Sequence, residues 1–309
     1  MTKLRVAVLY GGMSSERDVS LVSGAACADA LTAEGYDVTR IDVAPNLWEQ
    51  LHAADPDVVF NALHGDWGED GRVQGVLDMF GAPYTHSGVM ASALAMDKHR
   101  SKAVLRDVGI NVPDGLLVPR IDAAKDHAME PPYVLKPNGQ GSSKSVYIVR
   151  EGDAPPAKMA EDSGMGELVI CERFMPGREL TVSVMNGEAW DVTEIVPKNA
   201  FYDFDAKYSE GGSTHILPAD IADDVRELCL SWAALAHQAL GCRGVSRADF
   251  IFSDINADLT DIVKKVVMLE VNTQPGMTPT SLVPEQAALR GISFSRLCRR
   301  IVEDASWPR

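Results

Sequence analysis

Short β-branched runs alternate with helical patterns over the first third of the chain, and this alternation restricts the fold more than any other feature of the sequence. Strands are expected at 4–9, 37–43 and 57–63, and a helix over 18–34 stops at Gly35. Such alternation predicts a parallel sheet covered by helices. Ligands bind such sheets at the carboxyl ends of the strands. We therefore expect functional residues in the loops that follow these strands.

The rest of the chain has a different strand pattern. A helix is expected over 100–107, and the turn residues of 111–115 mark a crossing between domains. The strands expected beyond this crossing, at 133–136, 145–149 and 168–173, suit an antiparallel sheet. The last part has strands near 180–185, 248–253 and 266–271, a long helix before Gly241 and a helix at the C-terminus. Together these patterns predict an α/β (α+β) protein of more than one domain.

Composition and charge exclude several classes of protein. The 309 residues are 46% hydrophobic and 24% charged, which is ordinary for a globular protein and excludes disorder as the main state. The net charge of −15, without a basic block, disfavours binding to nucleic acid. The uncharged stretch 228–242 is too short to span a membrane, and the N-terminus lacks the pattern of a signal peptide. We expect a cytoplasmic protein without a nucleic-acid or membrane partner.

The cysteines predict no covalent or metal framework. They are five, an odd number, and none forms a C-x-x-C pair. Their positions are Cys27, Cys171, Cys229, Cys242 and Cys298. We interpret them as small apolar packing residues.

A glycine-rich loop follows the strand that ends at Lys136. In the sequence KPNGQGSS at 136–143, the glycines leave backbone N–H groups free to approach phosphate oxygens, and the lysine supplies a positive charge. The order of residues is not that of a Walker A loop, because the lysine comes first. Taken alone, such a loop is more often a flexible hairpin. Whether it binds phosphate depends on the residues around it.

Two pairs of polar residues interrupt apolar strands near the C-terminal end. Arg247 and Asp249 are two residues apart, as are Glu270 and Asn272, so each pair points to one face of its strand. If the two strands pair, Asp249, Glu270 and Asn272 offer the oxygen ligands that Mg²⁺ prefers, and Arg247 lies beside them to complement anionic oxygens. Either pair alone would more often be a solvated strand face with a surface ion pair. Together they predict a metal site.

Other candidate residues lie in loops. Gly276, in a turn just beyond the metal candidates, can present its N–H group to a ligand. Glu16 follows a glycine pair, and His64 lies at the expected end of a strand. Each alone has an ordinary explanation: a strand-exit turn, a helix N-terminal carboxylate and a polar loop histidine.

Further candidates come from the central and later parts of the chain. Glu172 and Glu179 flank the segment MPGR, and solvent exposure is their simplest explanation. Tyr208 belongs to an aromatic-rich segment followed by Gly211 and Gly212, which is either a packed loop or an active-site lid.

Seven motifs follow one another from residue 11 to residue 284. They are GGMSSERDVS at 11–20, ALHGDWGEDG at 62–71, YTHSGVMASALAMDK at 84–98, KPNGQGSS at 136–143, FYDFDAKY at 201–208, RADF at 247–250 and EVNTQPGMTPTSLVP at 270–284. Through these motifs the chain resembles, nearly end to end, the D-alanine–D-alanine ligases of the ATP-grasp superfamily. The sequence departs from the family after Ser143, where Lys144 and Ser145 stand in place of a common Val-Gly.

The resemblance implies an ATP-grasp fold with an N-terminal Rossmann-like parallel-sheet domain. The implied domains are an N-terminal substrate-binding domain at 1–97, a central lid domain at 98–180 and a C-terminal catalytic domain at 181–309, with ATP between the last two. The implied reaction joins two D-alanines with ATP hydrolysed to ADP and phosphate, for peptidoglycan precursor synthesis. Phosphorylation of the first carboxylate is needed because direct attack by an amine would expel oxide. The family also implies a homodimer.

The resemblance also implies roles for individual residues. Lys98 and Lys136 would hold ATP phosphates, and Lys207 would face the γ-phosphate. Glu172 and Glu179 would bind adenine and ribose. Asp249, Glu270 and Asn272 would bind two Mg²⁺ or Mn²⁺ ions. Arg247 and the Gly276 N–H group would stabilise the oxyanion of the tetrahedral intermediate, Glu16 would fix the first ammonium with His64 near it, and Glu16, Ser142 and Tyr208 would connect the lids. Ser281 and the Leu282 N–H group would bind the second carboxylate.

Two alternatives remain open at this point. One keeps the fold and changes the nucleophile, as in a D-alanine–D-lactate ligase or another carboxylate–amine ligase. Tyr208 argues against a D-alanine–D-lactate ligase. Depsipeptide-forming relatives have a histidine at this position, and its imidazolium would repel the ammonium of an incoming amino acid. The phenol of a tyrosine is neutral near pH 7 and would not. The other is a nucleotide sensor without catalysis, which would be favoured if metal or oxyanion residues were missing.

Overall fold

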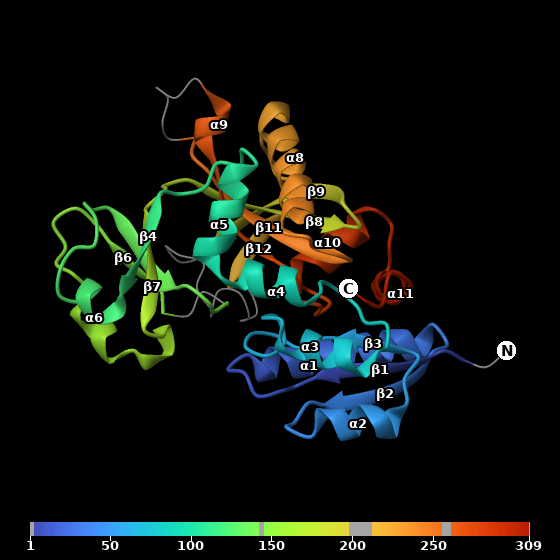
Figure 1. Ribbon diagram of the computed structural model, residues 1–309. Coiled ribbons are helices and arrows are strands. Elements are labelled where there is room, and N and C mark those ends of the chain that lie inside the picture. Colours follow the sequence, from blue (N-terminus) through green and yellow to red (C-terminus); the bar gives the residue numbers. More distant parts are fainter. Residues whose placement is uncertain (1–2, 142–144, 198–211, 255–260, 309) are drawn as a thin grey trace.

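The strands of the protein form three separate sheets, which lie in three lobes (Figure 1). The structure is a computed structural model that describes residues 3–141, 145–197, 212–254 and 261–308. Ser142, Lys207 and Tyr208 lie outside these residues. Within the described part of the chain no helix is long and apolar enough to cross a membrane.

The N-terminal sheet is parallel, as predicted. Its strand order is β2-β1-β3, with β1 at Arg5–Tyr10, β2 at Asp37–Asp42 and β3 at Val58–Asn61. Its helices are α1 at Arg17–Ala33, α2 at Leu47–Ala54 and α3 at Arg72–Phe80. Alternate residues of β1 serve opposite faces: Val6 and Val8 pack in the cluster that includes residues of α1, while Ala7 and Leu9 pack with residues of α2 and α3.

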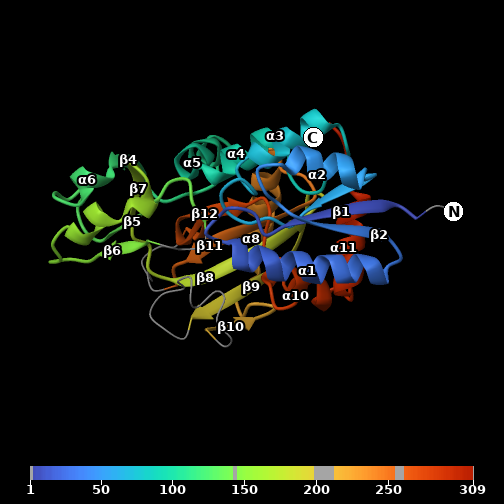
Figure 2. The same cartoon turned by 90° about the horizontal axis from the view of Figure 1, so that it is seen from below.

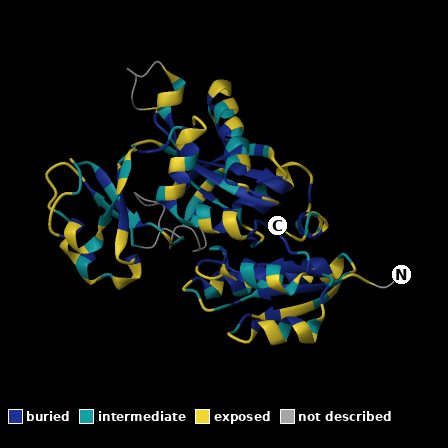
Figure 3. Ribbon diagram, in the orientation of Figure 1, coloured by how far each residue is buried: buried dark blue, intermediate teal, exposed yellow. Residues whose placement is uncertain are grey.

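A five-stranded antiparallel sheet forms the largest lobe. Its order is β10-β9-β8-β11-β12, with β8 at Arg178–Met185, β9 at Glu188–Pro197, β10 at Ser213–Ile216, β11 at Val245–Phe252 and β12 at Val266–Asn272. The helices around it are α4 at Val89–Met96, α5 at Lys98–Asp107, α8 at Asp223–Ala239 and the short α9 at Ile262–Lys265. Residues of α4, α5 and α8 share one buried apolar cluster with this sheet, and Figure 3 shows its strands as mostly buried.

Two C-terminal helices connect this sheet to the N-terminal sheet. They are α10 at Leu282–Leu289 and α11 at Phe294–Glu303. Leu297 and Ile301 of α11 are fully buried in one cluster with Leu31 of α1, and α11 packs against α1, as Figure 2 shows. The C-terminal part of the chain therefore helps to fix the N-terminal sheet.

A four-stranded antiparallel sheet forms the third lobe. Its order is β4-β7-β5-β6, with β4 at Gly115–Pro119, β5 at Tyr133–Pro137, β6 at Tyr147–Val149 and β7 at Leu168–Arg173. The helical segments beside it are α6 at Arg120–Ala123 and two 3-10 turns at Ala157–Glu161 and Ser163–Met165. The antiparallel arrangement expected for this part of the chain is confirmed.

The sequence pattern does not predict β4, β9 or β10. A turn is predicted at Gly115, but this residue begins β4 opposite Glu172, and a Cβ atom here would lie 2.9 Å from the Cys171 carbonyl oxygen. The predicted turn is wrong because the glycine has a different purpose here: without a side chain, it allows two strands to approach each other closely. The prediction for the cysteines is confirmed, since all five are free and buried.

Candidate active site

The predicted metal ligands meet on two paired strands. In the antiparallel pair β11–β12, Asp249 lies opposite Glu270 and Arg247 lies opposite Asn272. Each i,i+2 pair points to one face of its strand, and the register places both pairs side by side. The expected convergence of the four side chains is confirmed.

Asp249 is the centre of this group. The Arg247 guanidinium donates to both carboxylate oxygens, with Nε 2.8 Å from Oδ1 and Nη2 2.7 Å from Oδ2. The Asn272 amide donates to Oδ2 at 3.0 Å, and the Thr181 hydroxyl donates to Oδ1 at 2.7 Å. Thr181, which sequence reasoning missed, lies directly opposite Asp249 on β8. These bonds fix the carboxylate, which is 6% exposed.

The donor set fits magnesium better than a transition metal. The described residues contain no cluster of three or more His, Cys, Asp or Glu side chains that could hold a metal ion. Asp249, Glu270 and Asn272 instead supply two carboxylates and an amide oxygen. Mg²⁺ is commonly held by one or two carboxylates that share it with substrate phosphates, so the set suits a metal that arrives with a nucleotide.

A cavity of about 140 Å³ adjoins these strands. Its walls come from both the four-stranded and the five-stranded sheet, and they include apolar side chains such as Val134, Met175 and Leu269. Six of the predicted site residues line it: Lys98, Lys136, Glu172, Glu179, Asp249 and Glu270. A cavity that combines apolar walls with charged side chains is typical of a small-molecule site.

Lys98 connects the glycine-rich loop to the metal candidates. Its Nζ atom donates to the Gln140 carbonyl oxygen at 2.7 Å and lies 3.4 Å from the Glu270 carboxylate. Its backbone N–H group donates to the Asn138 carbonyl oxygen at 3.0 Å. Lys98 begins α5, so the start of this helix holds the loop beside the cavity.

A buried cluster of charged side chains lies beside the cavity, and Lys136 and Glu172 of this cluster line it. Lys136 Nζ is 2.8 Å from Glu172 Oε2, and Lys102 Nζ contacts Glu172 Oε1. Burial alone would raise the pKa of Glu172, but Lys136 and Lys102 outweigh it and lower this pKa to about 2. Burial, and then repulsion by Lys136, lower the pKa of Lys102 to about 7. Glu172 is therefore a fixed anion, not the solvent-exposed residue of the simplest sequence interpretation.

Lys102 was missed by sequence reasoning. The signal was its position four residues after Lys98, on the same face of α5.

Replacing Glu172 with glutamine is expected to lower the free energy of unfolding by about 3 kcal/mol near pH 7, because two buried lysines lose their shared anion. The folded-state pKa of Glu172 is depressed, so its contribution is present above the ordinary pKa of 4.5 and is lost as the pH falls toward about 2. The gap between wild type and Glu172→Gln in denaturant unfolding should therefore close in this pH range. Glu151→Gln, at an exposed position, serves as the control. A gap that stays constant down to pH 2.5 would contradict the ion pairing.

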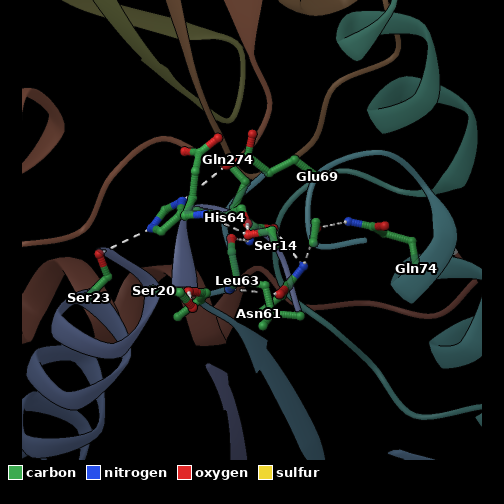
Figure 4. A network of polar contacts seen from close by, with 12 residues as sticks. Ser14, Ser20, Ser23, Asn61, Leu63, His64, Glu69, Gln74 and Gln274 are labelled. Atoms are coloured by element: carbon green, nitrogen blue, oxygen red, sulfur yellow. Dashed lines mark hydrogen bonds and ion pairs between the residues drawn. The ribbon is translucent and has the colours of Figure 1, made fainter. Parts of the chain in front are cut away.

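The loops of the N-terminal sheet hold a second polar group (Figure 4). The ring of His64 lies between the Glu69 carboxylate and the Ser23 hydroxyl, each at 3.1 Å. Ser14 donates to the His64 carbonyl oxygen at 2.6 Å and accepts from the Glu16 N–H group at 3.1 Å. Glu16 and His64, both predicted site residues, thus share a network and are 7% and 5% exposed.

Glu16 also lies close to the glycine-rich loop. A Cβ atom on Gly141 would lie 3.3 Å from Glu16 Oε1, and one on Gly65 would lie 2.9 Å from the same oxygen. The loop that precedes the predicted residue Ser142 therefore approaches the polar group around Glu16 and His64. Ser145, where the family commonly has glycine, has a φ of 57°, a left-handed conformation that glycine adopts more readily.

The turn after β12 carries the remaining predicted residues. Ser281 occupies the N-cap position of α10, and its Oγ atom lies 2.7 Å from Thr278 Oγ1 and accepts from the Thr278 N–H group at 3.1 Å. Leu282 is the first residue of α10, where backbone N–H groups have no partner within the helix. A Cβ atom on Gly276 would lie 3.0 Å from Ser281 Oγ. The turn thus brings Gly276 close to the helix start.

Family models match most of the chain. The model described as "D-ala D-ala ligase C-terminus" covers residues 104–303, and the one described as "D-ala D-ala ligase N-terminus" covers residues 44–87.

Curated relatives match almost end to end. A D-alanine–D-alanine ligase of Caulobacter vibrioides is 57% identical, over 97% of this chain and 92% of the relative. One of Parvibaculum lavamentivorans is 54% identical, over 98% of both chains. Among solved structures, a D-alanine–D-alanine ligase of Bacillus anthracis complexed with ATP has a TM-score of 0.80 and 29% identity, over 97% of both chains.

Proposed function

This chain belongs to the D-alanine–D-alanine ligase family, and we propose that it joins two D-alanines at the expense of ATP. The observation that best supports this activity is that two lysines and the carboxylates of Asp249 and Glu270 line one cavity. Arg247 binds Asp249 beside this cavity, and the Glu16 carboxylate lies close to Gly141 of the glycine-rich loop. The fold is the ATP-grasp fold of the family. The first D-alanine is activated as an acylphosphate, and the amine of the second displaces phosphate. The product is the dipeptide of peptidoglycan precursors.

ATP binding is placed in the cavity between the two antiparallel sheets. The apolar walls suit a purine ring, and Glu172 and Glu179 are placed at adenine and ribose. Lys98 and Lys136 are placed at the phosphates, because both line the cavity and their ammonium groups complement anionic oxygens. Lys98 is also bonded to the glycine-rich loop at Gln140. A relative of known structure binds ATP.

Metal binding is assigned to Asp249, Glu270 and Asn272. Two Mg²⁺ or Mn²⁺ ions held there would neutralise phosphate charge during phosphoryl transfer. The chain's own contribution is to hold these oxygens in place, through Arg247 and Thr181 at the Asp249 carboxylate. These bonds hold the Asp249 carboxylate in position before the nucleotide arrives.

The amino acids are placed at the meeting of the N-terminal loops and the turn after β12. Glu16 pairs with the ammonium of the first D-alanine, with His64 near it, and Ser281 and the Leu282 N–H group bind the carboxylate of the second. Arg247 and the Gly276 N–H group stabilise the oxyanion of the tetrahedral intermediate.

Three roles concern residues outside the described part of the chain and stay predictions. They are the lid contacts of Ser142 and Tyr208 and the γ-phosphate contact of Lys207. The three-domain division at 97/98 and 180/181, the homodimer and the cytoplasmic location also stay proposals.

The activity is tested by incubating the protein with Mg·ATP and D-alanine and measuring phosphate and product mass. We expect one phosphate per D-alanyl-D-alanine and no product from L-alanine. ATP binding without turnover would favour a nucleotide sensor instead.

A mixture of D-alanine and D-lactate should give mainly dipeptide from pH 6 to pH 8, and predominant D-alanyl-D-lactate would contradict the assigned nucleophile.

A further inference from the structure

A pair of buried amide side chains connects the N-terminal sheet to the turn after β12 (Figure 4). Asn61, the last residue of β3, donates through Nδ2 to Gln274 Oε1 at 2.6 Å. Gln274 in turn donates through Nε2 to the Leu63 carbonyl oxygen. The two residues are 213 positions apart in sequence, and their exposed fractions are 1% and 3%.

The nitrogen and the oxygen of both side-chain amides form hydrogen bonds in this contact. The second Nδ2 hydrogen of Asn61 is donated to the Gly68 carbonyl oxygen at 3.0 Å, and its Oδ1 atom accepts from the Leu63 N–H group at 3.1 Å. Buried polar groups that lose their partner are costly. Gln274 therefore has one favourable position, in which it holds both Asn61 and the backbone of Leu63.

The two ends of this contact carry different parts of the reaction. Leu63 directly precedes His64, whose carbonyl oxygen binds Ser14 and so holds the start of the Glu16 loop. Gln274 lies two residues after Asn272 and two before Gly276. The contact therefore fixes the distance between the Glu16 loop, assigned to the first D-alanine, and the strand end assigned to metal and oxyanion.

We propose that Asn61 and Gln274 are positioning residues, which align the carboxylate of the first D-alanine with the phosphoryl group that it attacks. This inference rests on the proposed function, because the alignment matters only for a reaction between a substrate held at Glu16 and a nucleotide in the cavity. Neither residue is assigned a contact with substrate. A shift of about 1 Å between reacting groups can reduce a rate roughly a hundredfold, so a loose contact here would lower kcat and leave the ATP cavity intact.

The chain offers a matched control in Gln74. Its Nε2 atom donates to the same Gly68 carbonyl oxygen at 2.8 Å, and its side chain is 1% exposed. Gln74 lies on α3, and the bond that it makes stays within the N-terminal lobe. Gln74→Met thus removes a buried amide of the same size from the same network without breaking the contact to the turn after β12.

The experiment compares wild type, Gln274→Met and Gln74→Met. Mg·ATP binding is measured by calorimetry, and kcat is expressed per ATP-binding site, so that unfolded protein does not count. We expect Gln274→Met to lose about a hundredfold in kcat, with KM for ATP within twofold, and Gln74→Met to stay within threefold of wild type. If Gln274→Met does not bind Mg·ATP, Gln274→Asn is used, which keeps an amide but is too short to span both partners.

The outcomes separate this inference from the proposed function. A loss of less than tenfold in the Gln274 variant, or an equal loss in Gln74→Met, would overturn the positioning role while wild type remains a ligase. Wild-type protein that forms no dipeptide would instead overturn the proposed function.

Discussion

Replacing Glu270 with glutamine is expected to reduce kcat by about a thousandfold or more while the fold persists. Glu270 lies opposite Asp249, lines the cavity and is 3.4 Å from Lys98 Nζ. The substitution keeps the size of the side chain and removes its negative charge. This charge is proposed to hold the metal ions that bind the ATP phosphates. Such ions contribute several kcal/mol to stabilising transition-state charge, and each 1.36 kcal/mol is a factor of ten in rate.

The measurement is steady-state phosphate release over a range of Mg²⁺ concentrations, together with thermal unfolding. Glu194→Gln is the matched control. Glu194 is a buried carboxylate of the same sheet, and it binds Arg178. Its neighbour Thr193 pairs with Thr181, which lies on the Asp249 face of the sheet. Because side chains alternate along a strand, Glu194 points to the opposite face. The control should keep kcat within threefold. Full activity of Glu270→Gln at saturating Mg²⁺ would contradict the metal assignment.

The polar face of β11 and β12 could be predicted because side chains alternate along a strand with a period of two. The register could not. Asp249 pairs with Glu270 but Phe250 pairs with Met268, so Leu269 is an extra residue, a β-bulge, on β12. Without this bulge the pairing from Phe252 onward would place Asp249 opposite Leu269. The exact meeting of the two carboxylates depends on a local irregularity that no periodicity reveals.

Partners from distant segments were the other part that sequence reasoning missed. Thr181 is an ordinary strand residue until β8 is placed beside β11, and Gln274 was noticed only as part of a turn motif. β9 also escaped prediction, because Glu188, Asp191 and Glu194 interrupt its apolar pattern. Glu194 is tolerated there since Arg178 of β8 binds it with two hydrogen bonds. Such compensation becomes visible only after the strands are paired.

Removal of the Arg247 guanidinium is expected to produce the second large loss of activity. Arg247→Met should lower kcat by about a hundredfold to a thousandfold, the usual effect of losing one oxyanion donor, with little change in KM for ATP. Asp249 would keep its bonds to Asn272 and Thr181, so the carboxylate remains held. Fold retention is checked by thermal unfolding, and ATP binding by calorimetry.

A lysine at the same position separates charge from geometry. The guanidinium binds Asp249 through Nε and Nη2 in a fork, and a lysine ammonium is a single point charge that cannot reproduce it. If Arg247 stabilises the oxyanion while anchored on Asp249, Arg247→Lys should recover only part of the activity lost in Arg247→Met. If the lysine variant matched wild type, a positive charge alone would suffice and the fork would have no catalytic importance. If the methionine variant kept full kcat, Arg247 would serve only to hold Asp249, and the oxyanion would depend on the Gly276 N–H group.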